Sequence, residues 1–143
     1  MDVHDTRRQL FWHGIFLFFL GLLSGVFVQT MTNPRMGLAA HTSGVTSGTF
    51  LAVLGAIWSE VRLGTRAEAA AYRFALYGAY AGWAAVQLAA IFGTIRMTPI
   101  AGAGHAAPAY QEAMVTFGLV TGAAALLLAC VLLLRGLGRH AAA

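Results

Sequence analysis

A histidine stands near the head of a long apolar segment, in the run AAHTSGVTSGTFLAVLG. At about 100° per residue, the helical face that carries His41 also carries small residues. They are Gly44, Ser47 and Gly48. A neutral imidazole is a common axial ligand of haem iron, and a strip of small side chains lets a flat porphyrin approach a helix backbone. The pattern predicts either such a ligand or a packed histidine with hydrogen-bonded nitrogens.

Aromatic and amide side chains line one face of a later apolar segment. Tyr77, Tyr80, Trp83 and Gln87 fall within about one third of a helix circumference. Tyr and Trp usually prefer membrane interfaces, so at this depth their polar tips need partners. We expect the stripe either to form helix–helix hydrogen bonds or to line a pocket for an aromatic substrate, with Tyr80 and Trp83 in its wall.

Two further groups of charged or ionisable residues have less specific patterns. His13 begins the first apolar segment, most of a helix length from His41 in depth, so the two should not hold one iron. Arg35 and Arg96 lie on the same side as His41 and could pair with haem propionates, although an interfacial arginine needs no such role.

The segment IRMTPIAGAGHAAPAYQE, residues 95–112, is the longest connection between apolar segments. Long loops without structure of their own are often functional. His105 and Glu112 could therefore serve as a gate or a proton donor, or they could belong to an ordinary solvated loop.

Several enzyme and transporter classes are excluded by missing motifs. The sequence has no phosphate-binding loop, dinucleotide fingerprint, Ser/His/Asp pattern or HExxH motif. Its single cysteine, Cys130, rules out an internal disulfide and a multi-cysteine metal site. The first apolar segment lacks the carboxylate of a proton-coupled exporter, and the second lacks the Glu and Asn pattern of glutathione-dependent membrane enzymes.

Composition indicates that these residues sit in a membrane. The chain has 143 residues, of which 59% are hydrophobic and 10% charged, against roughly 25% charged in soluble domains. Four segments are long enough to cross ~30 Å of hydrocarbon as helices. They are residues 10–30, 38–61, 72–94 and 113–134. We predict an all-α bundle of four transmembrane helices with short loops, forming a single transmembrane domain over residues 1–143.

The arginines predict the orientation of this bundle. Seven of the nine fall at one end: Arg7, Arg8, Arg62, Arg66, Arg73, Arg135 and Arg139. By the positive-inside rule, both termini should be cytoplasmic, in a multi-pass protein of the inner (cytoplasmic) membrane. Trp12 and Trp58 should then lie at the cytoplasmic interface. The charge reads as a topology signal, so no nucleic-acid partner is expected.

Each predicted helix carries a Gly-x-x-x-Gly pair. The pairs are Gly21/Gly25, Gly44/Gly48, Gly78/Gly82 and Gly118/Gly122. Such pairs let helix backbones approach closely in lipid. They predict tight packing within the bundle, or room for a flat cofactor or a neighbouring subunit.

Two motifs resemble a known family. The run NPRMGLAAHTSGVTSG, residues 33–48, is similar to the second-helix region of hydroxylaminobenzene mutases, and TPIAGAGHAAPAYQE, residues 98–112, looks like their outer loop. These mutases resemble styrene oxide isomerase, a homotrimer with haem b between subunits. The resemblance implies that His41 ligates ferric haem and that His13 and Gly14 match the His-Gly pair of the first helix. Ser47 and Gly82 replace two asparagines of that pattern, which implies altered substrate preference or activity.

The resemblance also implies a redox-neutral reaction. Ferric iron would act as a Lewis acid, converting an arylhydroxylamine to a 2-aminophenol or an aryl epoxide to an aldehyde. Tyr80 and Trp83 would line the pocket, because aromatic faces stabilise cations. Two alternatives remain: a non-enzymatic haem-bearing anchor or electron carrier, and a small transporter without a cofactor.

Overall fold

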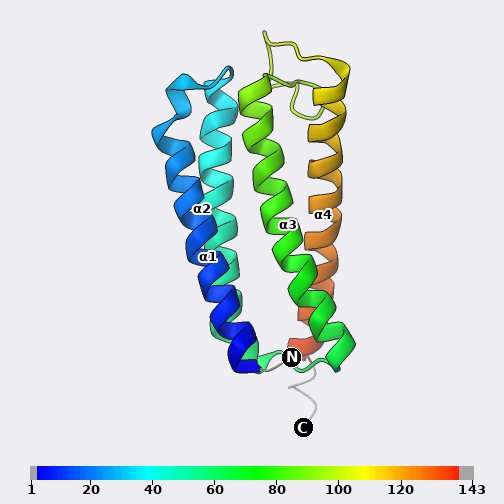
Figure 1. Cartoon of the computed structure of the whole chain (residues 1–143). Coiled ribbons are helices and arrows are strands. Elements are labelled where there is room, and N and C mark those ends of the chain that lie inside the picture. Colours follow the sequence, from blue (N-terminus) through cyan, green and yellow to red (C-terminus); the bar gives the residue numbers. More distant parts are fainter. Residues whose placement is uncertain (1–2, 139–143) are drawn as a thin grey trace.

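The computed structural model describes residues 3–138. Its four helices are α1 (Val3–Val26), α2 (Pro34–Ile57), α3 (Thr65–Phe92) and α4 (Ala109–Gly138). Short 3-10 turns, η1 (Val28–Thr30) and η2 (Trp58–Glu60), follow α1 and α2. No strand occurs within the described residues. The helices run up and down side by side, so the chain enters and leaves at one end of the bundle (Figure 1).

The bundle consists of two helical hairpins. Helix α1 packs along α2, and α3 packs along α4 (Figure 1). The hairpins meet chiefly where α2 contacts α3, whereas α1 touches α3 at fewer points. Consequently α1 and α4 are the outer helices, and the seam between α1 and α3 is only partly closed.

Glycines make the α1–α2 contact close. An added Cβ on Gly21 would lie 2.5 Å from the backbone nitrogen of Val45, and one on Gly48 would lie 2.4 Å from that of Phe18. In α3–α4, a Cβ on Gly78 would lie 2.9 Å from the Gly122 carbonyl oxygen. The predicted role of these glycines in tight helix packing is therefore confirmed at these positions.

The helix boundaries differ from the predicted segments: every helix begins earlier than predicted, whereas α1, α2 and α3 end at Val26, Ile57 and Phe92, before the predicted residues 30, 61 and 94. Helix α1 begins at Val3 rather than near residue 10, and α4 covers Ala109–Gly138 rather than 113–134. The segment 62–71, expected to be a connection, is helical from Thr65 onward. Hydropathy marks only the part suited to lipid, whereas a helix continues into water where residues such as Ala, Glu and Arg favour it.

Three helices are long and apolar enough to cross a membrane: His4–Val26, Thr65–Phe92 and Ala109–Gly138. Many large apolar side chains on the bundle surface are exposed, as lipid contact requires. Helix α2 does not meet the same hydropathy criterion because it is rich in hydroxyl and small residues. The hydroxyls of Thr42, Thr46 and Thr49 nevertheless bond to carbonyls four residues earlier in their own helix.

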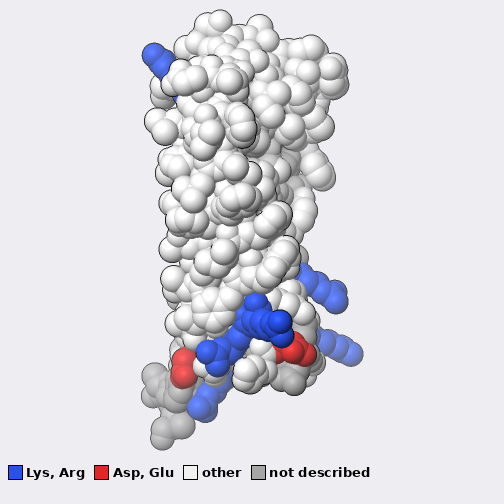
Figure 2. Space-filling model, turned by 60° about the vertical axis from the view of Figure 1, so that its left-hand side comes forward, with Lys and Arg blue, Asp and Glu red and all other residues white. Residues whose placement is uncertain are grey.

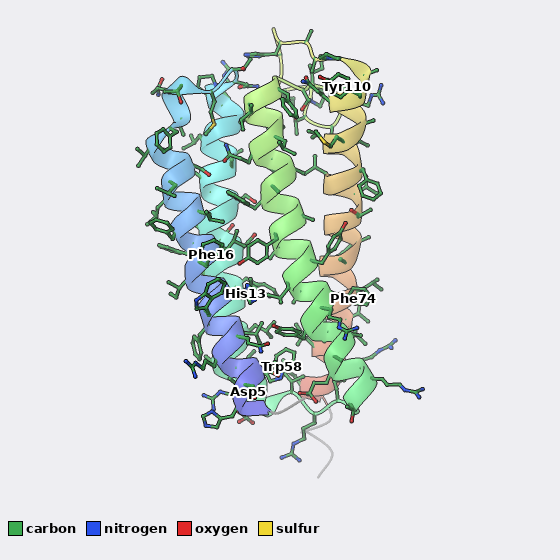
Figure 3. All side chains as sticks on the ribbon, viewed as in Figure 1. Asp5, His13, Phe16, Trp58, Phe74 and Tyr110 are labelled. Carbon is green, nitrogen blue, oxygen red and sulfur yellow. The ribbon has the colours of Figure 1, made fainter. Side chains whose placement is uncertain are left out.

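Charged residues gather at the end that holds the termini (Figure 2). This end contains the start of α1, the α2–α3 connection, the start of α3 and the end of α4, which together carry six of the seven arginines named above; Arg139 lies outside the described residues. Trp58 lies at this same end of the bundle (Figure 3), but its side chain is buried within the protein. Trp58 is 1% exposed and bonds through Nε1 to Glu68, whereas Trp12 is 59% exposed.

Candidate functional site

His41 enters the seam between α1 and α2. Its Nδ1 atom lies 2.8 Å from the carbonyl oxygen of Gly21, so Nδ1 must carry the proton and donate it. The ring also rests against Gly25, where an added Cβ would lie 2.7 Å from Nδ1. This tautomer leaves the lone pair on Nε2, which makes no hydrogen bond to any described residue.

These features fit an axial haem ligand. A ligating histidine usually donates its second ring nitrogen to a carbonyl or carboxylate, which fixes the ring and the tautomer. His41 is half-buried, so its ring is not closed off within the protomer. A porphyrin could not lie on the adjoining Gly44 and Gly48, because the α1 backbone fills the space beside both. The group would therefore have to meet Nε2 on the open side of the seam.

The other proposed cofactor contacts lie away from His41. Arg35 is exposed in the first turn of α2, about 120° around the helix from His41. His13 lies eight residues before Gly21, about 12 Å along α1. Its Nδ1 is 3.0 Å from the Tyr80 hydroxyl, and the two rings meet edge to face (His13 in Figure 3). The structure thus joins His13 to Tyr80 and does not bring it to His41.

The aromatic stripe of α3 forms helix–helix hydrogen bonds. The Tyr77 hydroxyl lies 2.7 Å from that of Thr121 on α4, and Tyr80 reaches His13 on α1. Gln87 accepts a 2.6 Å bond from Ser24, a buried α1 residue that sequence reasoning missed. The expected bonding role of the stripe is confirmed at these three positions.

Trp83 brings the stripe close to the histidine-bearing helix. A Cβ added to Gly44 would lie 2.9 Å from Trp83 Cδ1. Gly44 is three residues after His41, or about 4.5 Å along α2. Trp83 and His41 therefore lie at similar depths, although the structure shows no contact between them.

Of the two positions that depart from the resembled pattern, Gly82 has open surroundings. Ser47 is half-buried on α2. An added Cβ on Gly82 would meet nothing within 4 Å, in contrast to one on Gly78 or Gly122. A larger side chain at Gly82 could therefore enter space that is free within the protomer.

Glu112 is buried and hydrogen-bonds to the outer loop instead of facing solvent. Its carboxylate is 8% exposed and accepts bonds from the backbone nitrogens of Ile95 (2.8 Å) and Arg96 (3.1 Å). His105 Nε2 lies 3.0 Å from the Thr32 carbonyl oxygen and must be its donor. Asn33, another residue missed from the sequence, caps α2 through its side-chain oxygen and donates to the Ala101 carbonyl. These bonds tie the loop to both hairpins.

The sequence matches a known enzyme family over most of the chain. The family model of styrene oxide isomerase covers residues 6–138. The chain belongs to the styrene oxide isomerase family. Hydroxylaminobenzene mutase HabB of Ectopseudomonas oleovorans is 47% identical to this isomerase over 131 residues, which cover 91% of this chain and 80% of the relative. No solved structure matches the chain.

A second mutase supports the same assignment. Hydroxylaminobenzene mutase HabA of Ectopseudomonas oleovorans is 39% identical over 134 residues, covering 93% of this chain and 99% of the relative. Family membership makes the chain an isomerase. His41, the Ser24–Gln87 pair and the bonded outer loop all lie within the matched region.

Proposed function

We propose that this isomerase converts an arylhydroxylamine to a 2-aminophenol, with hydroxylaminobenzene as the representative substrate. The names of both mutases support this substrate class. An aryl epoxide such as styrene oxide is the second candidate, because the family model carries that name. In either case the substrate is a small aromatic molecule with a reactive oxygen.

We infer that haem b is the cofactor and that His41 would hold it through Nε2. The Nδ1–Gly21 hydrogen bond carries this inference, because it fixes the tautomer that a ligand needs. Arg35 is exposed on α2, and its guanidinium would pair with a haem propionate. When bound, ferric haem supplies a Lewis acid that polarises the N–O or C–O bond of the substrate.

The protein's own side chains would orient the aromatic substrate and exclude water. Trp83 packs against α2 at the depth of His41 and offers an aromatic face to a cationic ring. Tyr80 is fixed by His13, so its ring can form a rigid wall. The apolar surroundings of these residues would keep water from trapping a reactive intermediate.

The setting we propose is the inner membrane, crossed four times with both termini in the cytoplasm. The charged end of Figure 2 supports this orientation by the positive-inside rule. The antiparallel path of α2 beside α1 supports a fourth span (Figure 1). We further propose a homotrimer with haem between subunits, because the seam between α1 and α2 leaves His41 open on one side.

The first experiment measures haem by the Soret band of the detergent-purified protein. His41→Ala and His41→Gln should both lose haem, and the Gln variant can keep a bond to Gly21 and so tests folding separately. His13→Gln is the matched control and should retain haem. Full occupancy in folded His41→Gln would remove His41 from the proposed site.

The second experiment follows phenylhydroxylamine in ¹⁸O-labelled water without reductant. An intramolecular rearrangement should give 2-aminophenol that retains the substrate oxygen. Solvent label in the product, or strict dependence on dithionite, would contradict the proposed reaction. If the protein binds haem but turns over neither candidate substrate, the result would instead favour an electron carrier. If the folded protein shows neither bound haem nor turnover, the result would favour a transporter.

A further inference from the structure

An open groove follows the partly closed seam between α1 and α3. Its deeper part, of about 260 Å³, lies between the second half of α1 and the middle of α3. Its outer part, of about 250 Å³, reaches the loop after α1. Phe27, Met31 and Gln87 line both parts, so the two parts adjoin. The groove leads from Thr30 and Thr32 at its mouth to Trp83 at depth.

Trp83 supplies a hydrogen-bond donor without a partner. Its Nε1 atom is buried and makes no hydrogen bond with the described residues. An unpaired buried donor costs about 1–3 kcal/mol. An indole nitrogen can only donate, and no described residue accepts from it, so a bound molecule that brought an acceptor atom would remove this cost.

Gln87 supplies a second donor that is weakly engaged. The Ser24 hydroxyl lies 2.6 Å from Gln87 Oε1 and 3.0 Å from the Leu20 carbonyl oxygen. With its single hydrogen in the shorter bond, the Gln87 amide is oriented so that Nε2 faces Met31. Nε2 is 3.6 Å from the Met31 sulfur, and a thioether is a weak acceptor. An oxygen atom could therefore replace the sulfur at a net gain.

We propose that this groove binds the oxygen-bearing aromatic substrate or its product, with Gln87 Nε2 and Trp83 Nε1 donating to oxygen. The proposal rests on the substrate class proposed above and adds the residues that recognise the oxygen. Phe27 and the Trp83 ring supply aromatic walls on either side. The groove opens on the outside of the bundle, so a molecule dissolved in lipid can enter from the side. Gln87 and Trp83 determine specificity, and Ser24 acts as a positioning residue through the Gln87 amide.

Binding can be measured with 2-amino-4-fluorophenol and 4-fluoroaniline by ¹⁹F NMR in maltoside micelles, which contain no ester oxygen. The two probes differ in the hydroxyl group, so partition into detergent is separated from oxygen recognition. Wild-type protein should bind the phenol about five- to tenfold more tightly than the aniline, as one or two hydrogen bonds predict. Trp83→Phe and Gln87→Leu should each reduce that preference, and the double variant should abolish it.

The matched controls are Trp12→Phe, which alters an exposed tryptophan, and Gln111→Leu, which alters a glutamine on α4. Both should keep the wild-type preference. Ser24→Ala should weaken it less than Gln87→Leu, because the amide remains but can turn. In turnover assays, Gln87→Leu should raise KM more than it lowers kcat, with the Soret band unchanged.

The two proposals fail in different ways. His41→Gln should retain the phenol preference even though it loses haem, because the groove does not include His41. Equal binding of the two probes by wild-type protein, or an undiminished preference in the Trp83/Gln87 double variant, would overturn the groove proposal. Loss of the preference when phosphatidylcholine nanodiscs replace the micelles would show that lipid ester oxygen occupies the groove, and would also overturn it.

Discussion

His41 Nδ1 donates to the carbonyl oxygen of Gly21 across 2.8 Å, so a side chain of α2 is anchored on the backbone of α1. Any change in the spacing of these helices must therefore move the imidazole. The same bond assigns the proton to Nδ1 and leaves Nε2 free to bind a metal. The position of a candidate ligand thus depends on a helix that does not contain it.

Gly25→Ala should displace the His41 ring. The added Cβ would lie 2.7 Å from Nδ1, which is shorter than real Cβ contacts, and 3.2 Å from two ring carbons, which is tight. Overpacking of this kind costs about 1–3 kcal/mol. We expect a lower melting temperature and reduced haem occupancy, measured by thermal scanning and the Soret band. Gly64→Ala meets nothing within 4 Å and is the control; equal behaviour of the two variants would contradict the prediction.

Asparagine at the two divergent positions should alter activity without altering the fold. Gly82→Asn enters open space, so the free energy of unfolding should change by less than about 1 kcal/mol. If the two asparagines of the resembled family pattern orient the substrate, Gly82→Asn and Ser47→Asn should raise mutase turnover at constant haem content. Gly122→Asn is the steric control, because its Cβ would lie 2.9 Å from the Gly82 nitrogen. Unchanged rates and substrate preference in both variants would show that other residues build the pocket.

Glu112→Ala should loosen the outer loop. It removes the acceptor of two backbone N–H groups, at Ile95 and Arg96, and an unpaired buried donor costs about 1–3 kcal/mol. We expect a lower melting temperature and faster proteolysis between residues 95 and 108. Glu112→Gln keeps one acceptor oxygen and should lie between alanine and wild type. A loop that is cleaved no faster in Glu112→Ala would show that Asn33 and His105 suffice to hold it.

Tyr80→Phe should show whether Tyr80 only stabilises helix packing or also borders the substrate. The change removes the bond to His13 and should cost about 1 kcal/mol of stability. Tyr77→Phe removes an equivalent bond to Thr121 and is the matched control. If Tyr80 borders the substrate, only Tyr80→Phe should change kcat/KM beyond the loss of folded protein. Equal kinetics for the two would restrict Tyr80 to helix packing.

Much of the architecture is predictable because it depends on properties read along the chain. Apolar length places four helices, and the glycine spacing indicates where backbones approach. The helix ends are less predictable, because residues after Thr65 favour helix although they are polar. The burial of Trp58 is not predictable for a related reason: it depends on Glu68 and on the ring of Tyr72, which meet Trp58 only after α2 and α3 pack.

The candidate site is predictable only in part. His41 and the stripe of α3 stand out because ionisable and polar residues are rare in apolar segments. Ser24 and Asn33 look ordinary in sequence, because one is a common small residue and the other a common helix cap. Their cross-helix bonds to Gln87 and Ala101 depend on the register of neighbouring helices, which periodicity within one helix does not determine.

The glycine-lined pairing of α1 with α2 also bears on how the protein is made. On its own, α2 does not reach the mean hydropathy that marks α1 and α3 as candidate spans, although its threonine hydroxyls are bonded within the helix. We therefore expect α2 to leave the translocation machinery together with α1, as one helical hairpin. Substitutions that separate the pair, such as Gly48→Leu, would then lower the yield of inserted protein during synthesis, before any cofactor or substrate is bound.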